Sequence, residues 1–153
     1  MRRLPALVGL ALLLLAAPGR PDWSGVGGGR EVPLQGDGKT WTVRATLNGS
    51  VEGRFLLDTG ASYCVISQSI ARRLELRPSG ERVTLVTANG QVTAPLVTIR
   101  YFDLGVNRAR DVKAVVHDAV RPPLDGIVGL SFLNNFAYVI DAKARVVRLR
   151  PGG

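Results

Sequence analysis

The sequence predicts an all-β domain, a small closed antiparallel barrel that carries one or two short helices. Short segments in which apolar and polar residues alternate recur along residues 39–151, and turns rich in Gly, Asn and Asp separate them. Only residues 67–74 and 131–136 have the apolar spacing of a helix, and both segments are short. Many short strands joined by tight turns favour a barrel, because closure leaves few unpaired strand edges.

The N-terminal region differs in composition from this domain. Arg2 and Arg3 precede an apolar run over residues 4–17, which is the pattern of an export signal. The run is short for a membrane span, so we expect residues 1–19 to be a cleaved signal peptide, with an N-terminal membrane anchor as the alternative. Residues 20–38 are rich in Gly and Pro and are predicted to be a flexible tether. The protein is therefore expected to be exported to the periplasm, either free or anchored there.

The first predicted hairpin leads directly to a conspicuous carboxylate. Residues 41–47 alternate with a period of two, and Asn48-Gly49 is typical of a type I′ turn. The return strand, 51–57, ends at Asp58. A short strand over 63–66 and a helix over 67–74, for which Ser67 is the expected N-cap, come next.

The remaining segments continue the β pattern. A second hairpin is expected from residues 83–87 and 91–99, with a polar tip at Ala88-Asn89-Gly90. The other expected elements are strands at 101–104 and 112–116, a loop at 116–123, a helix at 131–136 and a final hairpin from 138–140 and 145–149.

The triplet Asp58-Thr59-Gly60 is the strongest chemical signal in the chain. A carboxylate at the end of an apolar strand is costly to place, because burial disfavours its charged form. Two such carboxylates that share one proton can act together as acid and base. Since the chain has one such triplet, this chemistry requires a homodimer. The alternative is a turn aspartate that binds its own backbone, which the apolar strand before it disfavours.

A second element supports the chemical interpretation. Ile127-Val128-Gly129 ends an apolar segment that passes into a short helix. Together with Asp58-Thr59-Gly60-Ala61-Ser62, it resembles the single-lobe retropepsin-like aspartic proteases, in particular a bacterial exported or membrane-anchored branch. The resemblance covers about residues 40–150. It implies that the domain is a lobe of the retroviral acid protease type.

The resemblance also implies roles for these residues. Asp58 would be the catalytic residue, and Thr59 would link the two active loops of a dimer. Gly60 would allow close backbone approach, and Ser62, next to Ala61, would hydrogen-bond the outer carboxylate oxygen. The remaining implied roles are a flap at Ala88, Asn89 and Gly90 and a loop-packing element at Ile127, Val128 and Gly129.

The implied activity is hydrolysis of peptide bonds by an Asp58 dyad that activates water, with a peptide or protein as substrate and no metal or organic cofactor. Two other classes stay open. The same fold could serve as a catalytically weak or inactive peptide-binding or dimerisation module of the cell envelope. It could also be a purely structural periplasmic β domain.

Composition excludes several further classes. The formal net charge is +8, but the basic residues are scattered, so binding to nucleic acid is not predicted. Cys64 and His117 are the only residues of their kinds, which leaves no ordinary zinc site, no intrachain disulfide and no Cys-His protease. Cys64 is expected to be a buried small residue, with an intermolecular disulfide left open. Asp125 is expected to cap or orient its loop.

Overall fold

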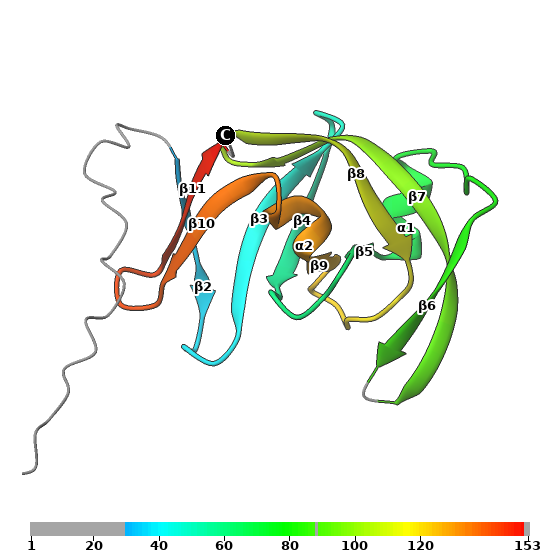
Figure 1. The fold of residues 1–153 in the computed structure, drawn as a ribbon, viewed down its shortest axis with the longest axis horizontal. Coiled ribbons are helices and arrows are strands. Elements are labelled where there is room, and N and C mark those ends of the chain that lie inside the picture. Colours follow the sequence, from blue (N-terminus) through cyan, green and yellow to red (C-terminus); the bar gives the residue numbers. More distant parts are fainter. Residues whose placement is uncertain (1–29, 88, 152–153) are drawn as a thin grey trace, which may run out of the picture.

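The computed structural model describes residues 30–87 and 89–151, and within them the predicted all-β fold is confirmed (Figure 1). Eleven strands and two short helices make up these residues. The strands are β1 (Glu31–Pro33), β2 (Gln35–Gly36), β3 (Trp41–Leu47), β4 (Val51–Leu57), β5 (Cys64–Ile66), β6 (Arg82–Thr87), β7 (Gly90–Leu104), β8 (Asn107–Val116), β9 (Gly126–Val128), β10 (Phe136–Asp141) and β11 (Val146–Pro151). The helices are α1 (Gln68–Arg73) and α2 (Leu130–Leu133).

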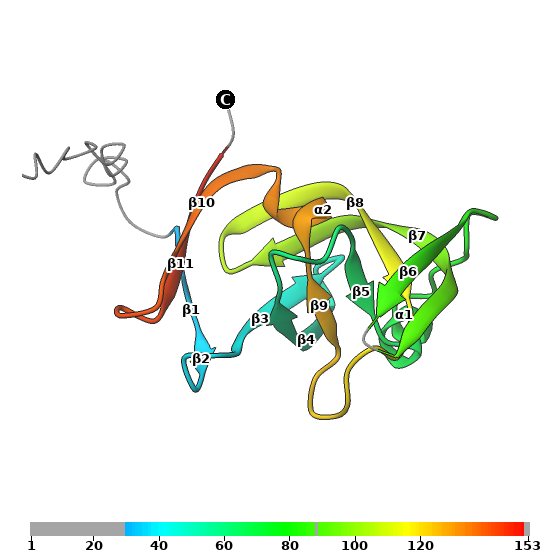
Figure 2. The ribbon, with the colours of Figure 1, turned by 60° about the horizontal axis from the view of Figure 1, so that its bottom comes forward.

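Six strands form the closed barrel. Their order is β3-β4-β9-β5-β8-β7, and pairing of β3 with β7 closes the circuit. Most pairs are antiparallel, as expected, but β9 runs parallel to β4 and β8 runs parallel to β5. Figure 2 shows β9 lying between β4 and β5, far from both in sequence. This insertion brings the segment around residue 127 next to the end of β4.

The β3–β4 hairpin matches the sequence prediction at both strands. Asn48 and Gly49 have φ angles of 49° and 71°, the left-handed values that a type I′ turn requires. The turn sets the register that pairs Leu47 with Val51. Val43, Leu47 and Phe55 then face the core, each with at most 2% of its surface exposed. The register therefore fixes where β4 ends and Asp58 begins.

The core extends from the barrel to the C-terminal hairpin through aromatic rings. Phe55, Phe102, Phe132 and Phe136 form a continuous series, with successive ring centroids 5.7, 5.2 and 5.1 Å apart. Offset and edge contacts of this kind add to the stabilisation from burial alone. The series joins β4 and β7 to α2, so the short helix is held against the barrel wall.

Part of the predicted tether belongs to the folded domain. Residues 31–33 form β1 and pair with β11 in a three-stranded sheet with β10. Val32 and Leu34 are only 4% exposed, and this burial outweighs the Gly- and Pro-rich composition that predicted a flexible segment. The tether prediction was therefore wrong for residues 31–36. The expected signal or anchor, residues 1–19, and the tether up to residue 29 lie outside the described residues.

Several further elements differ from the sequence prediction. β8 begins at Asn107, where a strand over 112–116 was expected, and β10 spans Phe136–Asp141, where 138–140 was expected. β7 is one strand that continues through Arg100, where two strands were expected. α2 begins one residue early and ends at Leu133. The Asn135 side chain donates to the backbone oxygens of Ser131 and Phe132, at 3.0 and 2.8 Å, and so ends the helix before Phe136. In the described part of the chain, neither helix has the length or apolar character needed to cross a membrane.

Candidate active site

Asp58 is the first residue after β4 and is held by the backbone of β9. Its N–H donates to the Val128 oxygen at 3.0 Å, which continues the parallel pairing of Leu57 with Val128. The side chain is half-buried, and the two residues that follow are exposed. The carboxylate therefore stands at the surface end of a strand from which Val51, Phe55 and Leu57 reach the barrel core.

The turn after Asp58 fixes one of its two carboxylate oxygens. The N–H of Gly60 donates to Oδ1 at 2.8 Å, and the N–H of Ala61 donates to the Asp58 backbone oxygen at 3.3 Å. A Cβ at Gly60 would lie 3.2 Å from Oδ1, so glycine gives this turn its close approach. Within the described single chain, the Ser62 hydroxyl does not hydrogen-bond Asp58. Thr59 is exposed, and no hydrogen bond joins its side chain to another described residue.

The start of α2 holds the other end of the same loop. The N–H groups of Leu130 and Ser131 donate to the oxygens of Ala61 and Ser62, at 2.8 and 3.1 Å. Gly129 packs so closely that an added Cβ would lie 2.6 Å from the Ala61 oxygen. The structure thus brings Ile127-Val128-Gly129 beside Asp58–Ser62, the neighbours expected from the sequence.

Ser131 has a structural role that the sequence did not reveal. Its Oγ accepts a hydrogen bond from Cys64 N at 2.8 Å and donates to Lys113 O at 2.7 Å. One hydroxyl therefore connects α2 to both β5 and β8. The only sequence signal was a hydroxyl residue at the start of an otherwise apolar helix, and such residues commonly bind backbone groups.

Cys64 is fully buried and takes part in the same packing. Its Sγ accepts a hydrogen bond from Gly129 N at 3.4 Å. Burial raises the pKa of the Cys64 thiol, which keeps it protonated at neutral pH. The residue is therefore a packing element of the loop support and is not activated as a nucleophile.

Asp125 orients the loop that leads into β9. Its Oδ2 accepts from Arg54 N at 2.9 Å, and its own N–H donates to Arg54 O at 2.7 Å. The Asp125 backbone oxygen also accepts from Ser67 N, next to α1. The carboxylate is thus engaged by β4 and stabilises the loop, in agreement with the orienting role expected from the sequence.

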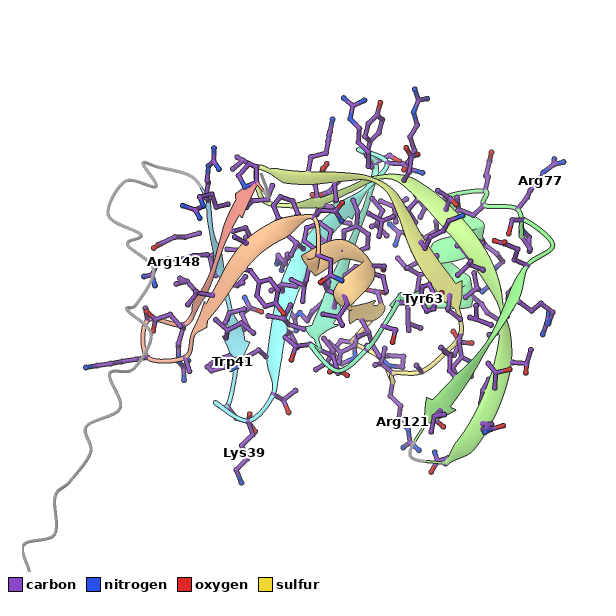
Figure 3. All side chains as sticks on the ribbon, in the orientation of Figure 1. Lys39, Trp41, Tyr63, Arg77, Arg121 and Arg148 are labelled. Atoms are coloured by element: carbon purple, nitrogen blue, oxygen red, sulfur yellow. The ribbon has the colours of Figure 1, made fainter. Side chains whose placement is uncertain are left out.

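A cleft of about 870 Å³ lies between the Asp58 loop and the β6–β7 hairpin. Asp58, Tyr63 and Ile127 line one side, and Leu85 and Asn89 line the other. Figure 3 labels Tyr63 on the half of the molecule that carries this hairpin, with Trp41 and Lys39 on the opposite half. The hairpin tip, through Asn89, and the Asp58 carboxylate therefore line the same cavity. Of the other two residues expected at the tip, Gly90 has a φ angle of 111°, and Ala88 lies outside the described residues.

Sequence reasoning missed a third side of the cleft. His117, Asp118 and Ala119 follow β8 and line the cavity together with Asp58. The sequence placed them only in a polar loop before Pro122, and no local pattern indicated that β8 would end beside β5. Among the described residues, no group of three or more His, Cys, Asp or Glu side chains is arranged to hold a metal ion.

Comparisons with known proteins agree with this geometry. A family model described as aspartyl protease matches residues 43–132. A protein of Sinorhizobium sp., described as an uncharacterized protein in the cobV 5′ region, is 30% identical over 129 residues, which cover 80% of this chain and 53% of that protein. The chain thus spans about half the length of this relative. The crystal structure of a retropepsin-like aspartic protease from Rickettsia conorii matches with a TM-score of 0.61 and 23% identity, over 80% of this chain and 89% of that one. This match shows that the fold is retropepsin-like.

Proposed function

The chain belongs to the aspartyl protease family, and on that premise we propose that it is an aspartic endopeptidase with Asp58 as its catalytic residue. One observation carries the proposal. Asp58 stands in a large cleft with one carboxylate oxygen held by Gly60 N, while its loop is fixed by β9 and α2. A carboxylate positioned this firmly at a cavity is suited to acid–base chemistry.

The proposed reaction uses Asp58 from two copies of the chain. One carboxylate is ionised and takes a proton from water, and the other is protonated and donates to the carbonyl oxygen of the peptide bond. Thr59 and Gly60 are exposed in the single chain, which leaves the loop accessible to a second copy. A twofold axis at this loop would place the two identical loops against each other, with Thr59 between them.

We propose that the substrate is an extended peptide gripped between the Asp58 loop and the hairpin. β6 is the edge strand of its sheet, and Thr84, Leu85, Val86 and Thr87 line the cleft. An extended peptide can pair with such an edge and place alternate side chains on opposite sides. In this proposal the tip of β6–β7 acts as a flap that excludes water from the reacting groups.

The proposed location follows from the N-terminal sequence alone. The Arg2-Arg3 pair and the apolar run over 4–17 support export, with the protease domain free in the periplasm or held at the membrane by residues 1–19. Its substrates would then be envelope proteins or peptides. Detection of the tagged full chain in the periplasmic fraction would support this placement, and detection only in the cytoplasm would contradict it.

Cleavage of an unbiased peptide library, at acidic to neutral pH, tests the activity. We expect wild type to cleave and Asp58→Asn to lose about 1,000-fold or more of the turnover while keeping its stability. Well-folded, dimeric wild type that binds peptides without cutting them would indicate a binding module instead. Cleavage that survives in Asp58→Asn would contradict the proposed mechanism.

Mixing subunits tests the dyad separately. If each active site needs Asp58 from both subunits, an equimolar mixture of wild type and Asp58→Asn keeps about a quarter of the activity of an equal total amount of wild type, once subunits have exchanged. Independent subunits would keep about half. The second result would leave an aspartic protease but contradict the shared dyad.

A further inference from the structure

Asp118 is a second carboxylate in the cleft, and its position is well defined. It follows β8 in a segment where His117 N donates to Ile66 O at 3.0 Å and Ala119 N donates to His117 O at 2.9 Å. Asp118 Oδ1 accepts a hydrogen bond from Gln68 N, the first residue of α1, at 2.9 Å. Its second oxygen, Oδ2, accepts no hydrogen bond from any described residue. One oxygen therefore holds the side chain in place, and the other is available to a ligand.

The cleft has the opposite charge balance to the rest of the molecule. The chain carries 20 Lys and Arg against 12 Asp and Glu. Yet Asp58 and Asp118 are the charged residues among those lining the cleft, and no Lys or Arg lines it within the described chain. Arg121, three residues beyond Asp118 and labelled in Figure 3, is exposed and is not part of the lining. The cavity is therefore an acidic site on a basic protein.

The other lining residues of the cleft are both apolar and polar. Tyr63, Val65, Leu85, Val92 and Ile127 supply apolar surface, and Asp118 lies in the loop with His117. Apolar surface accepts apolar side chains of many kinds, whereas a carboxylate, even the exposed one of Asp118, discriminates by charge. The residue best placed to distinguish one substrate from another is thus Asp118.

We propose that Asp118 makes the site selective for peptides that place a Lys or Arg side chain beside it, with apolar residues in the rest of the cleft. This inference rests on the proposed endopeptidase function and names its substrate class. Oδ2 would accept a charge-assisted hydrogen bond from the cationic side chain, and Glu or Asp at the same substrate position would be repelled. Asp118 acts on specificity, and Asp58 performs the chemistry.

The decisive variant is Asp118→Asn, because asparagine keeps an oxygen that can accept from Gln68 N while it removes the charge. A peptide set in which each position in turn is Lys, Leu or Glu is cleaved by wild type and by the variant. We expect wild type to prefer Lys over Leu at one position by about 3- to 10-fold in kcat/KM, and the preference to shrink towards one in Asp118→Asn. High salt should reduce the wild-type preference in the same direction.

Two controls separate a charge effect from a structural one. Asp118→Glu keeps the charge and should keep the Lys preference, whereas Arg121→Gln changes a neighbouring exposed charge and should leave the Lys-to-Leu ratio unaltered. Equal thermal midpoints for wild type and Asp118→Asn would show that the helix contact survives. A ratio that changes as much in Arg121→Gln as in Asp118→Asn would overturn the proposal, because the effect would then be long-range charge alone.

Binding measurements keep this inference distinct from the catalytic one. In an Asp58→Asn background, the same Lys, Leu and Glu peptides are titrated with and without Asp118→Asn. If binding prefers Lys peptides and this preference needs Asp118, the inference is supported even if no peptide is ever cleaved. The lack of cleavage would contradict only the proposed endopeptidase activity. Two results would overturn the inference: cleavage by wild type without a preference for Lys or Arg, or a preference that survives in Asp118→Asn. Either result would leave the proposed protease activity supported.

Discussion

The two walls of the cleft are built in opposite ways. The wall formed by Asp58–Ser62 is held by other elements of the chain. The N–H groups of Leu130 and Ser131 donate to its backbone oxygens, and the Val128 oxygen accepts from Asp58 N. The hairpin wall is held mainly from within: Thr87 Oγ1 donates to Gly90 O, and Asn89 N donates to Thr87 Oγ1.

Burial follows the same division between the two walls. Cys64, Val128 and Phe132 behind the Asp58 loop have no exposed surface, whereas Val86 on the hairpin is 84% exposed. Regions with many buried contacts open rarely, and regions with few open easily. The cleft thus combines a wall that has many buried supports behind its carboxylate with a wall that has few.

The largest expected difference between the walls is in thiol reactivity. Cys64 lies behind the fixed wall, where burial raises the pKa of its thiol, so it should react with a neutral alkylating reagent only when that wall opens. In a Cys64→Ala background, Val86→Cys should react at nearly the rate of a free thiol. We expect Cys64 to react at least about 1,000-fold more slowly, as measured by mass spectrometry. Similar rates for both positions would contradict the comparison.

Adding one carbon at Gly129 should disrupt the fixed wall. A Cβ there would lie 2.6 Å from the Ala61 oxygen and would force apart α2 and the Asp58 loop. We expect Gly129→Ala to lower the free energy of unfolding by about 3 kcal/mol and to remove most of the activity. Urea denaturation measures the first quantity. Asn89→Ala on the hairpin is the matched control and should change stability by less than about 0.5 kcal/mol.

Removing the Ser131 hydroxyl should weaken the same wall less severely. Ser131→Ala leaves Cys64 N and Lys113 O without their hydrogen-bond partner. We expect a loss of about 1–2 kcal/mol in the free energy of unfolding, because the N–H of the buried Cys64 is left without its partner. Ser69→Ala, on the exposed side of α1, is the control. Equal effects of the two substitutions would show that Ser131 does not connect β5 and β8 in solution.

A change at the hairpin tip should affect turnover more than folding. Gly90 has a φ angle of 111°, which a β-branched residue adopts only with strain, and an added Cβ would meet no atom within 4 Å. We expect Gly90→Val to lower kcat/KM for a peptide about tenfold while the urea midpoint falls only slightly. Equal losses of activity and stability would indicate an ordinary exposed hairpin with no role as a flap.

The smallest expected effect lies outside both walls and serves as a reference. The Ala144 N–H, followed by Arg148, holds the pKa of Asp141 below its ordinary value near 3.8. Because the folded pKa is the lower one, this contribution to stability is present above about pH 4 and is lost as the pH falls through the folded value. Asp141→Asn should therefore reduce the acid sensitivity of unfolding slightly. Unfolding at pH 3 and pH 7 would reveal the difference, and no change would contradict it.

Local patterns predicted those parts of the fold that local physics determines. Alternation and Asn48-Gly49 gave β3 and β4 at their observed bounds, and Ser67 caps α1 through a hydrogen bond from Ile70 N. The start of the domain was misjudged, because burial of Val32 and Leu34 depends on β11, which lies at the other end of the chain. Whether such a short segment forms a stable strand depends on its pairing partner, which its own few residues do not reveal.

The site shows the same limit. Asp58 and Gly60 could be singled out because their motif is contiguous, and Ile127-Val128-Gly129 because the resemblance named it. Asp118 and Ser131 could not, since each acts through a residue far away in sequence: Gln68 in one case, Cys64 and Lys113 in the other. Contacts of this kind depend on the barrel order, which no local pattern contains.

The parallel pairing of β4 with β9 also governs when the site can form. Arg54 and Asp125 hydrogen-bond each other across 71 positions of sequence, and the Asp58 loop takes its supports from residues still further along. Such a high contact order favours slow folding, because a long segment of chain must be ordered before the pairing stabilises it. While the ribosome is still translating, a nascent chain that has reached Asp58 lacks the strand that positions it. The carboxylate acquires this geometry only after residues up to Ser131 have been made, so the site is absent from any shorter nascent chain.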